Sequence, residues 1–323
     1  ANGRWTVSTS ADLGVDQTLP AYDGGYPQLS SSSVSAGAVG VALGRGTDVT
    51  LASTHTGDNA GVTFGNGAQV VKNEGGTATL RVDSGGGIAM ASGSAIDARI
   101  GALNVDFNAD ASGVVAKNAT QVNAGGGSPS YEVDYGASIG LTDATINANG
   151  GNIRFFGQGD AVNGRAIGGS VSNSEDTWRD GIALNGSTLT TAGSGQVSLR
   201  GQGRTRVDTQ DSDTDFVYRA TDGVALQGSA VQAGSGGVTI DGLAALGGGG
   251  VRIGNGSSLE TPGNVSVTGR GATWTDNTLP AGSIGTTTAV GIDSSFIDAG
   301  GDVRIEGTGA NLEALTKYLG FAA

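Results

Sequence analysis

A cassette of about twenty residues recurs along the chain, and repetition of that length restricts the fold more than any other feature of the sequence. The clearest copy starts at Gly181 and reads GIALNGSTLTTAGSGQVSLRG. The other copies start at Gly87, Gly140, Gly223, Gly250 and Gly291. Repeats of this size are typical of solenoids, in which each unit stacks on its neighbours and the stack buries a continuous core.

Each cassette contains three short apolar segments separated by turn-forming residues. In the copy at Gly181 these segments are Ile182 and Leu184, then Leu189, then Val197 and Leu199. Apolar and polar residues alternate within a segment, which is the period of a half-buried strand. Asn-Gly, Ala-Gly and Ser-Gly pairs separate the segments and tolerate the backbone of tight turns. The pattern predicts one coil of three strands per cassette, stacked at a strand spacing of ~4.8 Å.

The spacing between copies is uneven, which predicts insertions into a regular stack. The residues that we expect to be equivalent in successive coils are Ile153, Val197, Val238, Val265 and Val303. We interpret the polar stretches 159–180, 203–222 and 270–290 as excursions that leave the stack at one corner, as loops or partial extra coils.

Gly-x-Gly recurs after the third strand of the cassette, at 157–159, 201–203, 269–271 and 307–309. None of these continues as G-x-G-x-x-G into a helix, so we interpret them as corners and not as nucleotide sites.

These features predict an all-β protein, a right-handed parallel β-helix of about ten to twelve coils. Residues 1–310 would form a single shaft segment, in which Val34, then Val39, Val41 and Leu43, then Val49 and Leu51 are early strand segments. The tail 311–323 differs, because Leu312, Leu315 and Leu319 have helical spacing. The tail is either a short helix that caps the stack or the product of truncation.

The amino-acid composition restricts the partners and the kinds of site that this chain can have. The chain has 17 basic and 30 acidic residues and a net charge of −13, which makes nucleic acid an unfavourable partner. It contains no cysteine, which excludes disulfides and thiolate metal sites. No apolar run approaches the length of a membrane span. The first residues do not form a signal peptide, so we expect a mature piece or fragment of a longer chain.

Three pieces of the sequence resemble the haemagglutinin-type repeats of the filamentous haemagglutinin-like exoproteins of two-partner secretion. They are SVSAGAVGVALGRGTDVTLAST at 33–54, AIDARIGALNVDFNADAS at 95–112, and the cassette G-[IV]-x-L-x-G-S-x-[LV]-x-x-G-S-G-x-V-x-[LI]. In that family a right-handed β-helix follows a secretion domain, and a dedicated outer-membrane transporter exports the chain. Members act as adhesins, haemolysins, toxin carriers or haem-acquisition proteins. Neither the family's secretion domain nor its activity-bearing tip or C-terminal toxin is recognisable here, so none of these activities maps onto a residue.

The resemblance implies a secreted, monomeric protein of the bacterial cell surface that serves in virulence and cell adhesion. Its expected partners are the outer-membrane transporter and a receptor or glycan on a host or neighbouring cell. Its expected role is that of a structural shaft that displays loops or a distal module for attachment. The alternative is a β-helical polysaccharide lyase or hydrolase, because many such enzymes have this fold.

Three aromatic residues in the excursions are candidate ligand-binding residues: Trp178, Tyr218 and Trp274. Exposed aromatic side chains on loops often anchor partners or sugars. They could equally fold back over the shaft as apolar lids.

A second candidate site is a run of alternating carboxylates made up of Asp208, Asp211, Asp213 and Asp215. Calcium prefers several oxygen ligands of this kind, although the run lacks the glycine and glutamate of an EF-hand loop. It is either a calcium site or a solvated acidic loop that pairs with Arg204, Arg206 and Arg219. No other cofactor is predicted.

The sequence offers no catalytic residue that we would single out, and we expect no enzymatic activity. The sole histidine, His55, lies in a polar turn that we expect to face solvent, and one histidine provides little basis for a catalytic triad or a haem site. Basic residues are too sparse to support a lyase by themselves.

Overall fold

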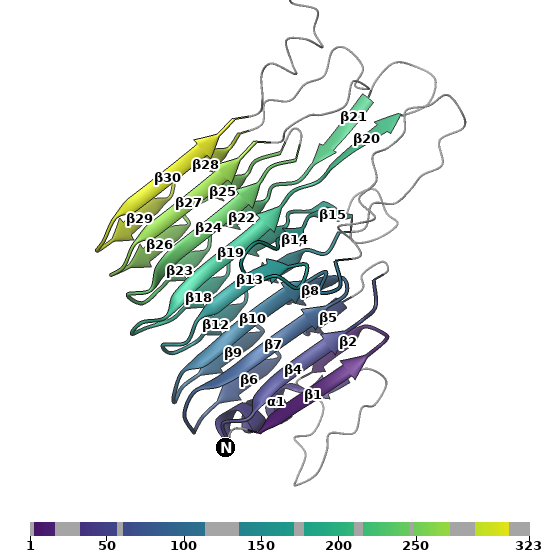
Figure 1. Cartoon of the computed structure of the whole chain (residues 1–323), viewed down its shortest axis with the longest axis vertical. Coiled ribbons are helices and arrows are strands. Elements are labelled where there is room, and N and C mark those ends of the chain that lie inside the picture. The colour runs from purple at the N-terminus through teal and green to yellow at the C-terminus, as the bar shows by residue number, and fades with distance from the viewer. Residues whose placement is uncertain are drawn as a thin grey trace, which may run out of the picture.

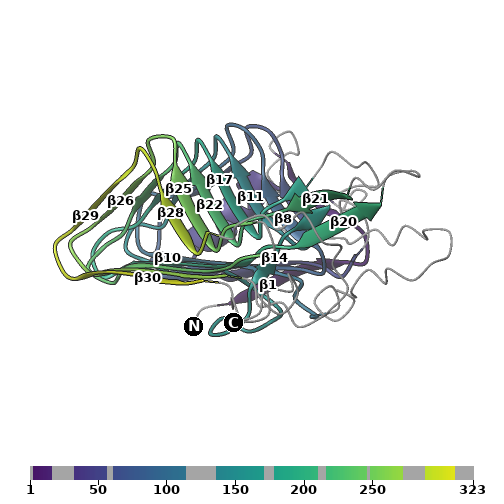
Figure 2. The same ribbon diagram turned by 90° about the horizontal axis from the view of Figure 1, so that it is seen from above.

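The computed structural model describes residues 3–16, 33–56, 61–113, 136–170, 178–209, 216–245, 248–271 and 288–309. These residues form a parallel β-helix with three long parallel sheets, which confirms the predicted fold class (Figure 1). We call the three sheets A, B and C; their strands are given below. From β5 (Gly61–Phe64) onward the chain passes repeatedly through sheet B, then sheet C, then sheet A. Viewed from its C-terminal end the path runs counter-clockwise towards the viewer, so the helix is right-handed (Figure 2).

Sheet A contains β1 (Arg4–Thr9), β4 (Asp48–Ser53), β7 (Ala78–Ser84), β10 (Leu103–Ala109), β13 (Ile153–Gly157), β19 (Gln196–Gln202), β24 (Gly237–Leu243), β27 (Val265–Arg270) and β30 (Val303–Thr308) in spatial order, and β14 (Ala166–Ile167) pairs with β19. Sheet B contains β3 (Ser33–Ser35), β2 (Leu13–Asp16), β5 (Gly61–Phe64), β8 (Gly87–Met90), β11 (Ile139–Thr142), β17 (Ile182–Asn185), β22 (Val224–Gln227), β25 (Val251–Gly254) and β28 (Val290–Ile292). Sheet C contains β6 (Gln69–Lys72), β9 (Ala95–Ala98), β12 (Thr145–Asn147), β18 (Thr188–Thr190), β23 (Ala230–Gln232), β26 (Ser258–Thr261) and β29 (Phe296–Ala299).

The core consists of columns of equivalent inward-facing residues. Ile153, Val197, Val238, Val265 and Val303 are successive partners in sheet A, which confirms the predicted equivalence. The first four are buried. The ladder of sheet A has nine strands in one continuous order. The described residues therefore form fewer coils than the ten to twelve predicted. The reason is that helix α1 (Ala36–Gly44) and the excursions use residues that the prediction assigned to coils.

Side chains and backbone amides link successive coils at the turn from sheet B to sheet C. The Ser187 hydroxyl accepts a hydrogen bond from the Ala144 amide, the Ser229 hydroxyl from the Ser187 amide, and the Ser257 hydroxyl from the Ser229 amide, each at 3.1 Å. Such a ladder satisfies buried amides that no strand pairs, and it favours one register over its neighbours.

One early prediction was wrong. Residues 36–44 form helix α1 (Ala36–Gly44), so Val39, Val41 and Leu43 do not belong to a strand. Ser35 caps the helix by accepting a hydrogen bond from the Ala38 amide at 3.4 Å. The helix packs against β6, the first strand of sheet C, at the N-terminal end of the stack (Figure 1). It buries positions i, i+3, i+4, i+7 and i+8, which lie on one helical face.

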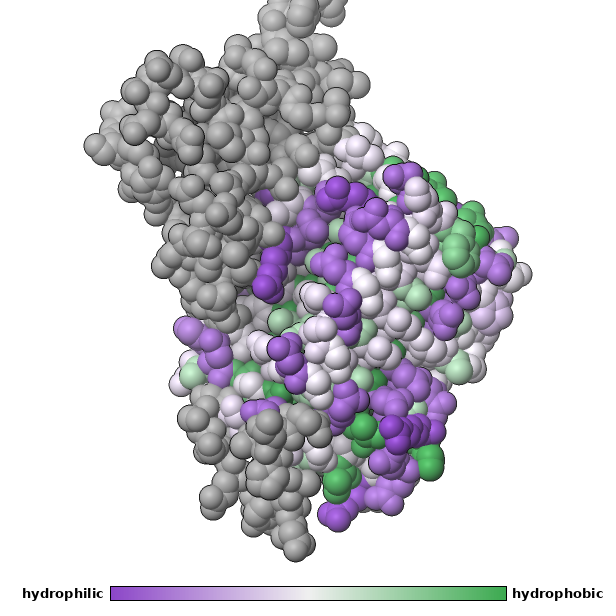
Figure 3. Space-filling model, turned by 180° about the vertical axis from the view of Figure 1, so that it is seen from behind, coloured by the Kyte–Doolittle hydropathy of each residue, from purple (hydrophilic) through white to green (hydrophobic). Residues whose placement is uncertain are grey.

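The two described ends of the stack differ. The last coil exposes Ile292, Phe296, Val303 and Ile305. Figure 3 shows the corresponding apolar surface in green at the upper end of the molecule, seen from behind Figure 1. The helix predicted in the tail 311–323 lies outside the described residues.

Candidate functional site

The edge where sheet A meets sheet B is the place at which the shaft accepts insertions. From β4 onward the long connections follow β10, β13, β19 and β27, and all of them run from sheet A to sheet B. The turns from B to C and from C to A contain only two to five residues. The prediction that excursions leave the stack at one corner is confirmed, and we call this corner the A–B edge (Figure 2).

The first glycine of the recurring Gly-x-Gly pattern lies at the same edge, and Gly242 takes its place in a coil that lacks the pattern. Gly201, Gly242, Gly269 and Gly307 are successive register partners in sheet A. A Cβ atom on Gly201 would lie 1.9 Å from the carbonyl oxygen of Gly223, at the start of the next pass through sheet B. The pattern is therefore a corner at which two backbone segments touch, as predicted, and not a phosphate loop.

Two of the excursions contain strands of their own. In the excursion after β13, β14 adds to sheet A, while β15 (Gly169–Ser170) and β16 (Trp178–Arg179) pair antiparallel. After β19, β20 (Thr205–Thr209) and β21 (Phe216–Ala220) form an antiparallel hairpin that projects from the shaft (Figure 1). The second excursion is thus a hairpin and not a partial coil.

Two of the predicted aromatic residues lie on these strands. Trp178 belongs to β16 and is paired with Ser170, and Tyr218 belongs to β21 and is paired with Val207. The structure describes their backbone positions but not their side chains. Trp274 lies outside the described residues. A role for these three residues in ligand binding stays a prediction.

The predicted calcium site falls on the same hairpin. Asp208 is in β20, paired with Val217 of β21, whereas Asp211, Asp213 and Asp215 lie outside the described residues. Among the described residues, no group of three or more histidines or carboxylates could hold a metal ion. Calcium binding to this run stays a prediction.

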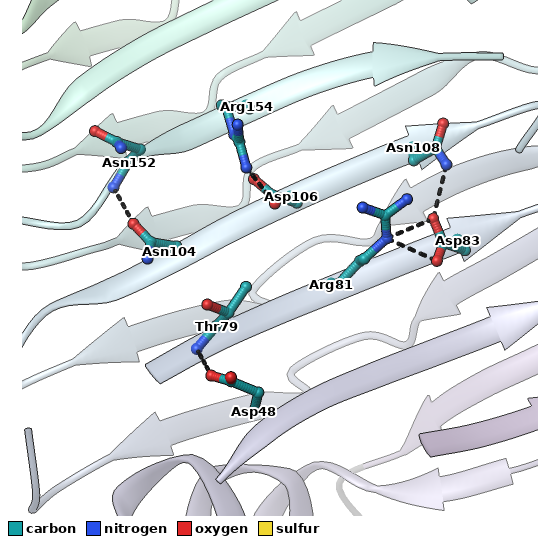
Figure 4. A network of polar contacts seen from close by, with 9 residues as sticks. All are labelled: Asp48, Thr79, Arg81, Asp83, Asn104, Asp106, Asn108, Asn152 and Arg154. Carbon is teal, nitrogen blue, oxygen red and sulfur yellow. Dashed lines mark hydrogen bonds and ion pairs between the residues drawn. The ribbon is translucent and has the colours of Figure 1, made fainter. Parts of the chain in front are cut away.

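The outer face of sheet A carries a polar network that the sequence reasoning did not identify (Figure 4). Arg154 of β13 binds Asp106, its register partner in β10, through two hydrogen bonds of 2.7 Å and 2.6 Å. Arg81 donates to both carboxylate oxygens of Asp83 on the same strand, at 2.9 Å and 2.8 Å. Asn108 donates to Asp83 from the next coil at 2.7 Å. These contacts join three successive coils.

A row of Asp and Asn side chains lies at the start of successive strands of sheet A. A side-chain oxygen accepts from the amide of the equivalent residue one coil later: Asp48 from Thr79 at 2.8 Å, and Asn104 from Asn152 at 3.0 Å (Figure 4). The Asn152 side chain repeats the contact with the Gln196 amide at 3.0 Å. This ladder has a structural role comparable to that of the serine ladder.

The electrostatics of the face follow from these pairs. Hydrogen bonds to Asp83 and to Asp106 raise the pKa values of Arg81 and Arg154, respectively, so both guanidinium groups stay charged. Asp106 is buried and engaged on both oxygens by Arg154. Neither Asp83 nor Asp106 is arranged to act as a general base, because each carboxylate already accepts strong hydrogen bonds.

A pair of carboxylates lies at the A–B edge, at the start of two successive passes through sheet B. Asp180 accepts a hydrogen bond from the Asp222 amide at 2.7 Å, and Asp222 accepts one from the Gly249 amide at 2.6 Å. Asp222 is buried and forms an ion pair with Arg252. Burial, reinforced by the nearby charge of Asp222, raises the pKa of Asp180 to about 6.

Asp180→Asn should stabilise the protein at neutral pH. The folded-state pKa of Asp180 lies above the ordinary value of 3.8, so the folded state retains this proton to a higher pH than the unfolded chain does. The retained proton on Asp180 makes a favourable contribution to the free energy of unfolding, which is complete below about pH 4 and is lost as the pH rises to about 6. Asparagine keeps the acceptor for the Asp222 amide and carries no charge. The expected gain at pH 7 is about 3 kcal/mol, and it should vanish near pH 4.

Chemical denaturation of the Asp180→Asn variant and the parent at several pH values measures this effect. Asp298→Asn, which changes an exposed aspartate of β29, is the control and should change little at any pH. A gain that is the same at pH 4 and pH 7 would contradict the assignment to Asp180 ionisation.

Two further titratable residues have structural partners. His55 contacts Asp12 through Nδ1 at 3.0 Å, and both side chains are about half exposed. The hydroxyl of Ser53 accepts from the backbone amide of His55 at 3.3 Å. This arrangement does not use the imidazole of His55 to activate that serine, so it gives no catalytic triad.

Comparison with known proteins returns no match: neither a family model, nor a curated protein, nor a solved structure is significantly similar to this chain. In the part of the chain that the structure describes, no helix is long and apolar enough to span a membrane.

Proposed function

We propose that this chain is the structural shaft of a secreted adhesin of the bacterial cell surface, and that its A–B edge displays the attachment surface. The observation that carries this proposal is the one-sided placement of the long connections on an otherwise continuous stack. Stacking continues through the coils that carry excursions, because the insertions leave the strand ladders in register. The stacked coils provide a stiff support, and the insertions at the A–B edge provide surfaces that differ from coil to coil.

The resemblance to filamentous haemagglutinin-like exoproteins supports the setting. In this proposal an outer-membrane transporter exports the chain, and the exposed edge binds a receptor or glycan on a host or neighbouring cell. The net charge of −13 keeps a long β structure soluble outside the cell and discourages edge-to-edge association.

Removal of the β20–β21 hairpin provides a direct test. Arg204 and Thr221 already bind each other across its base, since the Thr221 amide donates to the Arg204 carbonyl at 2.9 Å. Replacement of residues 205–220 by Gly-Gly should therefore close the connection without strain on the coil. We expect unchanged circular dichroism, an unchanged melting temperature and about tenfold weaker cell binding if the hairpin carries a main contact.

A second variant serves as the matched comparison, in which residues 272–287, between β27 and β28, are replaced by a short glycine linker. Trp178→Ala, Tyr218→Ala and Trp274→Ala then locate the contact within an excursion. Full binding by both shortened variants and by all three aromatic variants would contradict attachment through the A–B edge.

The carboxylate pair favours one alternative, a glycan lyase or hydrolase. A carboxyl with a pKa of about 6 beside a second carboxylate is the kind of group that can act as a general acid near neutral pH. Release of reducing or unsaturated ends from acidic polysaccharides, lost in Asp180→Asn, would favour the enzyme. Absence of release from a panel of such polymers would favour the shaft.

A further inference from the structure

Three arginines converge on one carboxylate on the outer side of sheet A, near the A–B edge. Arg200 of β19 and Asp241 of β24 are register partners, with Nη2 of Arg200 2.7 Å from Oδ2 of Asp241. Arg165, from the excursion after β13, reaches the same oxygen at 2.7 Å. Arg270, at the end of β27, reaches Oδ1 at 2.9 Å. We call these four residues the Arg–Asp cluster.

The cluster has more positive charge than its carboxylate can neutralise. Three guanidinium groups face the single charge of Asp241, and the pKa of Arg200 is lowered by burial and by the charges of Arg165 and Arg270. Asp160 also acts on Arg200, but its own oxygens accept from the amides of Val162 and Asn163 and from the Asn163 side chain. A surplus of positive charge is unusual for a chain whose net charge is −13.

Hydrogen-bond donors are also in surplus. Each guanidinium group has five N–H donors, whereas a carboxylate offers two oxygens. Within the part of the chain that the structure describes, Arg165 and Arg200 each have a buried Nε without a hydrogen-bond partner, so Asp241 does not satisfy the groups gathered around it. The Asn163 carbonyl accepts one further bond from Arg165 at 3.4 Å.

Burial increases the energetic consequence of this arrangement and leaves an approach to it. The side chains of Arg165, Arg200 and Asp241 are 15%, 18% and 8% exposed, so solvent screens their repulsion weakly. Arg270 is 47% exposed and places one guanidinium group at the open side of the cluster. A ligand that reached Arg270 would also lower the repulsion among the three cations.

We propose that the Arg–Asp cluster is a binding site for an oxyanion, either a free inorganic sulfate or a sulfate group carried by an acidic glycan. Planar guanidinium groups bind such anions through paired charge-assisted hydrogen bonds. The anion adds the negative charge and the acceptor oxygens that Asp241 alone does not provide. This site does not depend on the attachment role proposed above.

Sodium sulfate is the first probe, compared with sodium chloride at equal ionic strength. Isothermal titration and thermal unfolding should show sulfate binding and a sulfate-specific rise in melting temperature for the parent protein. Arg270→Gln should bind sulfate about tenfold more weakly, because it removes one charge-assisted contact. Arg304→Gln is the control, since Arg304 is an exposed arginine of β30 that pairs with Glu306 on its own strand.

Asp241→Asn separates a binding site from a purely structural cluster. Removal of the competing carboxylate should tighten sulfate binding by about tenfold even where it lowers stability without sulfate. If this variant does not fold, the comparison of Arg270→Gln with Arg304→Gln still decides the question. The proposal fails if the parent responds equally to sulfate and chloride, or if the two arginine variants bind sulfate equally well.

A second arm distinguishes the two sources of the anion. A sulfated oligosaccharide and its desulfated counterpart are titrated into the parent protein and into Arg270→Gln. Tighter binding of the sulfated sugar than of inorganic sulfate, reduced by Arg270→Gln, assigns the site to a glycan. Binding of inorganic sulfate without that gain assigns it to the free anion.

Discussion

Gly242→Ala is expected to lower the free energy of unfolding by about 3 kcal/mol or more, although it adds only a methyl group. The new Cβ would lie 1.8 Å from the carbonyl oxygen of Gly250 and 2.5 Å from its carbonyl carbon. These are backbone atoms at the start of the next pass through sheet B, so no side-chain rotation relieves the clash. Either the corner opens or the pairing of β24 with its neighbours distorts. Urea unfolding followed by circular dichroism measures the loss.

Gly76→Ala provides the matched control for this substitution. Gly76 lies in the turn between β6 and β7, and a Cβ placed there would meet no atom within 4 Å. The same chemical change should therefore alter stability by less than about 1 kcal/mol. Equal losses at the two positions would contradict the assignment of the A–B edge as a place of backbone contact.

Phe107→Ala should lower the free energy of unfolding by about 3–5 kcal/mol. Phe107 is fully buried and stacks on Phe155 of the next coil, with ring centroids 4.9 Å apart and planes 5° apart. It also stacks on Phe64 across the core at 5.8 Å. Truncation removes the central ring of three and leaves a cavity that the rigid strand ladders fill poorly.

Phe296→Ala is the control for the aromatic substitution, because Phe296 is 54% exposed in the last coil. It should reduce stability by less than about 1 kcal/mol in the same denaturation experiment. If the two phenylalanine variants lose similar amounts, the stacked rings do not form the central part of the core.

Much of the shaft was predictable because its sequence signals are local and repeated. Alternation in Val197–Leu199 marks a strand, and the same pattern one coil later at Val238–Ile240 supplies its neighbour. Helix α1 was not predictable in this way. The spacing of Val39, Val41 and Leu43 fits a strand, and the helix forms at the end of the stack, where it covers β6. Tertiary packing outweighed local alternation there.

The polar sites were harder to predict, because they join residues far apart in the chain. Arg165 and Asp241 are separated by 76 positions and meet only through the excursion after β13. Asp106 and Arg154 are 48 positions apart, because the connection between β10 and β11 separates them. The cassette alignment does contain one usable signal: the alternate residues of the third strand in each copy face outward, and several are charged. Charges in register on adjacent strands are candidates for pairing.

The position of the A–B edge has a consequence for how a ligand would meet this molecule. The connections after β10, β13 and β19 start from three consecutive coils, whose strands lie only ~4.8 Å apart along the axis. That separation is no larger than the distance between the two strands of a single hairpin. A sugar chain or protein approaching this side would span the bases of several insertions at once. Several insertions together would then determine which ligand binds. A change in one insertion could alter the specificity for the ligand while the neighbouring insertions retain part of the affinity.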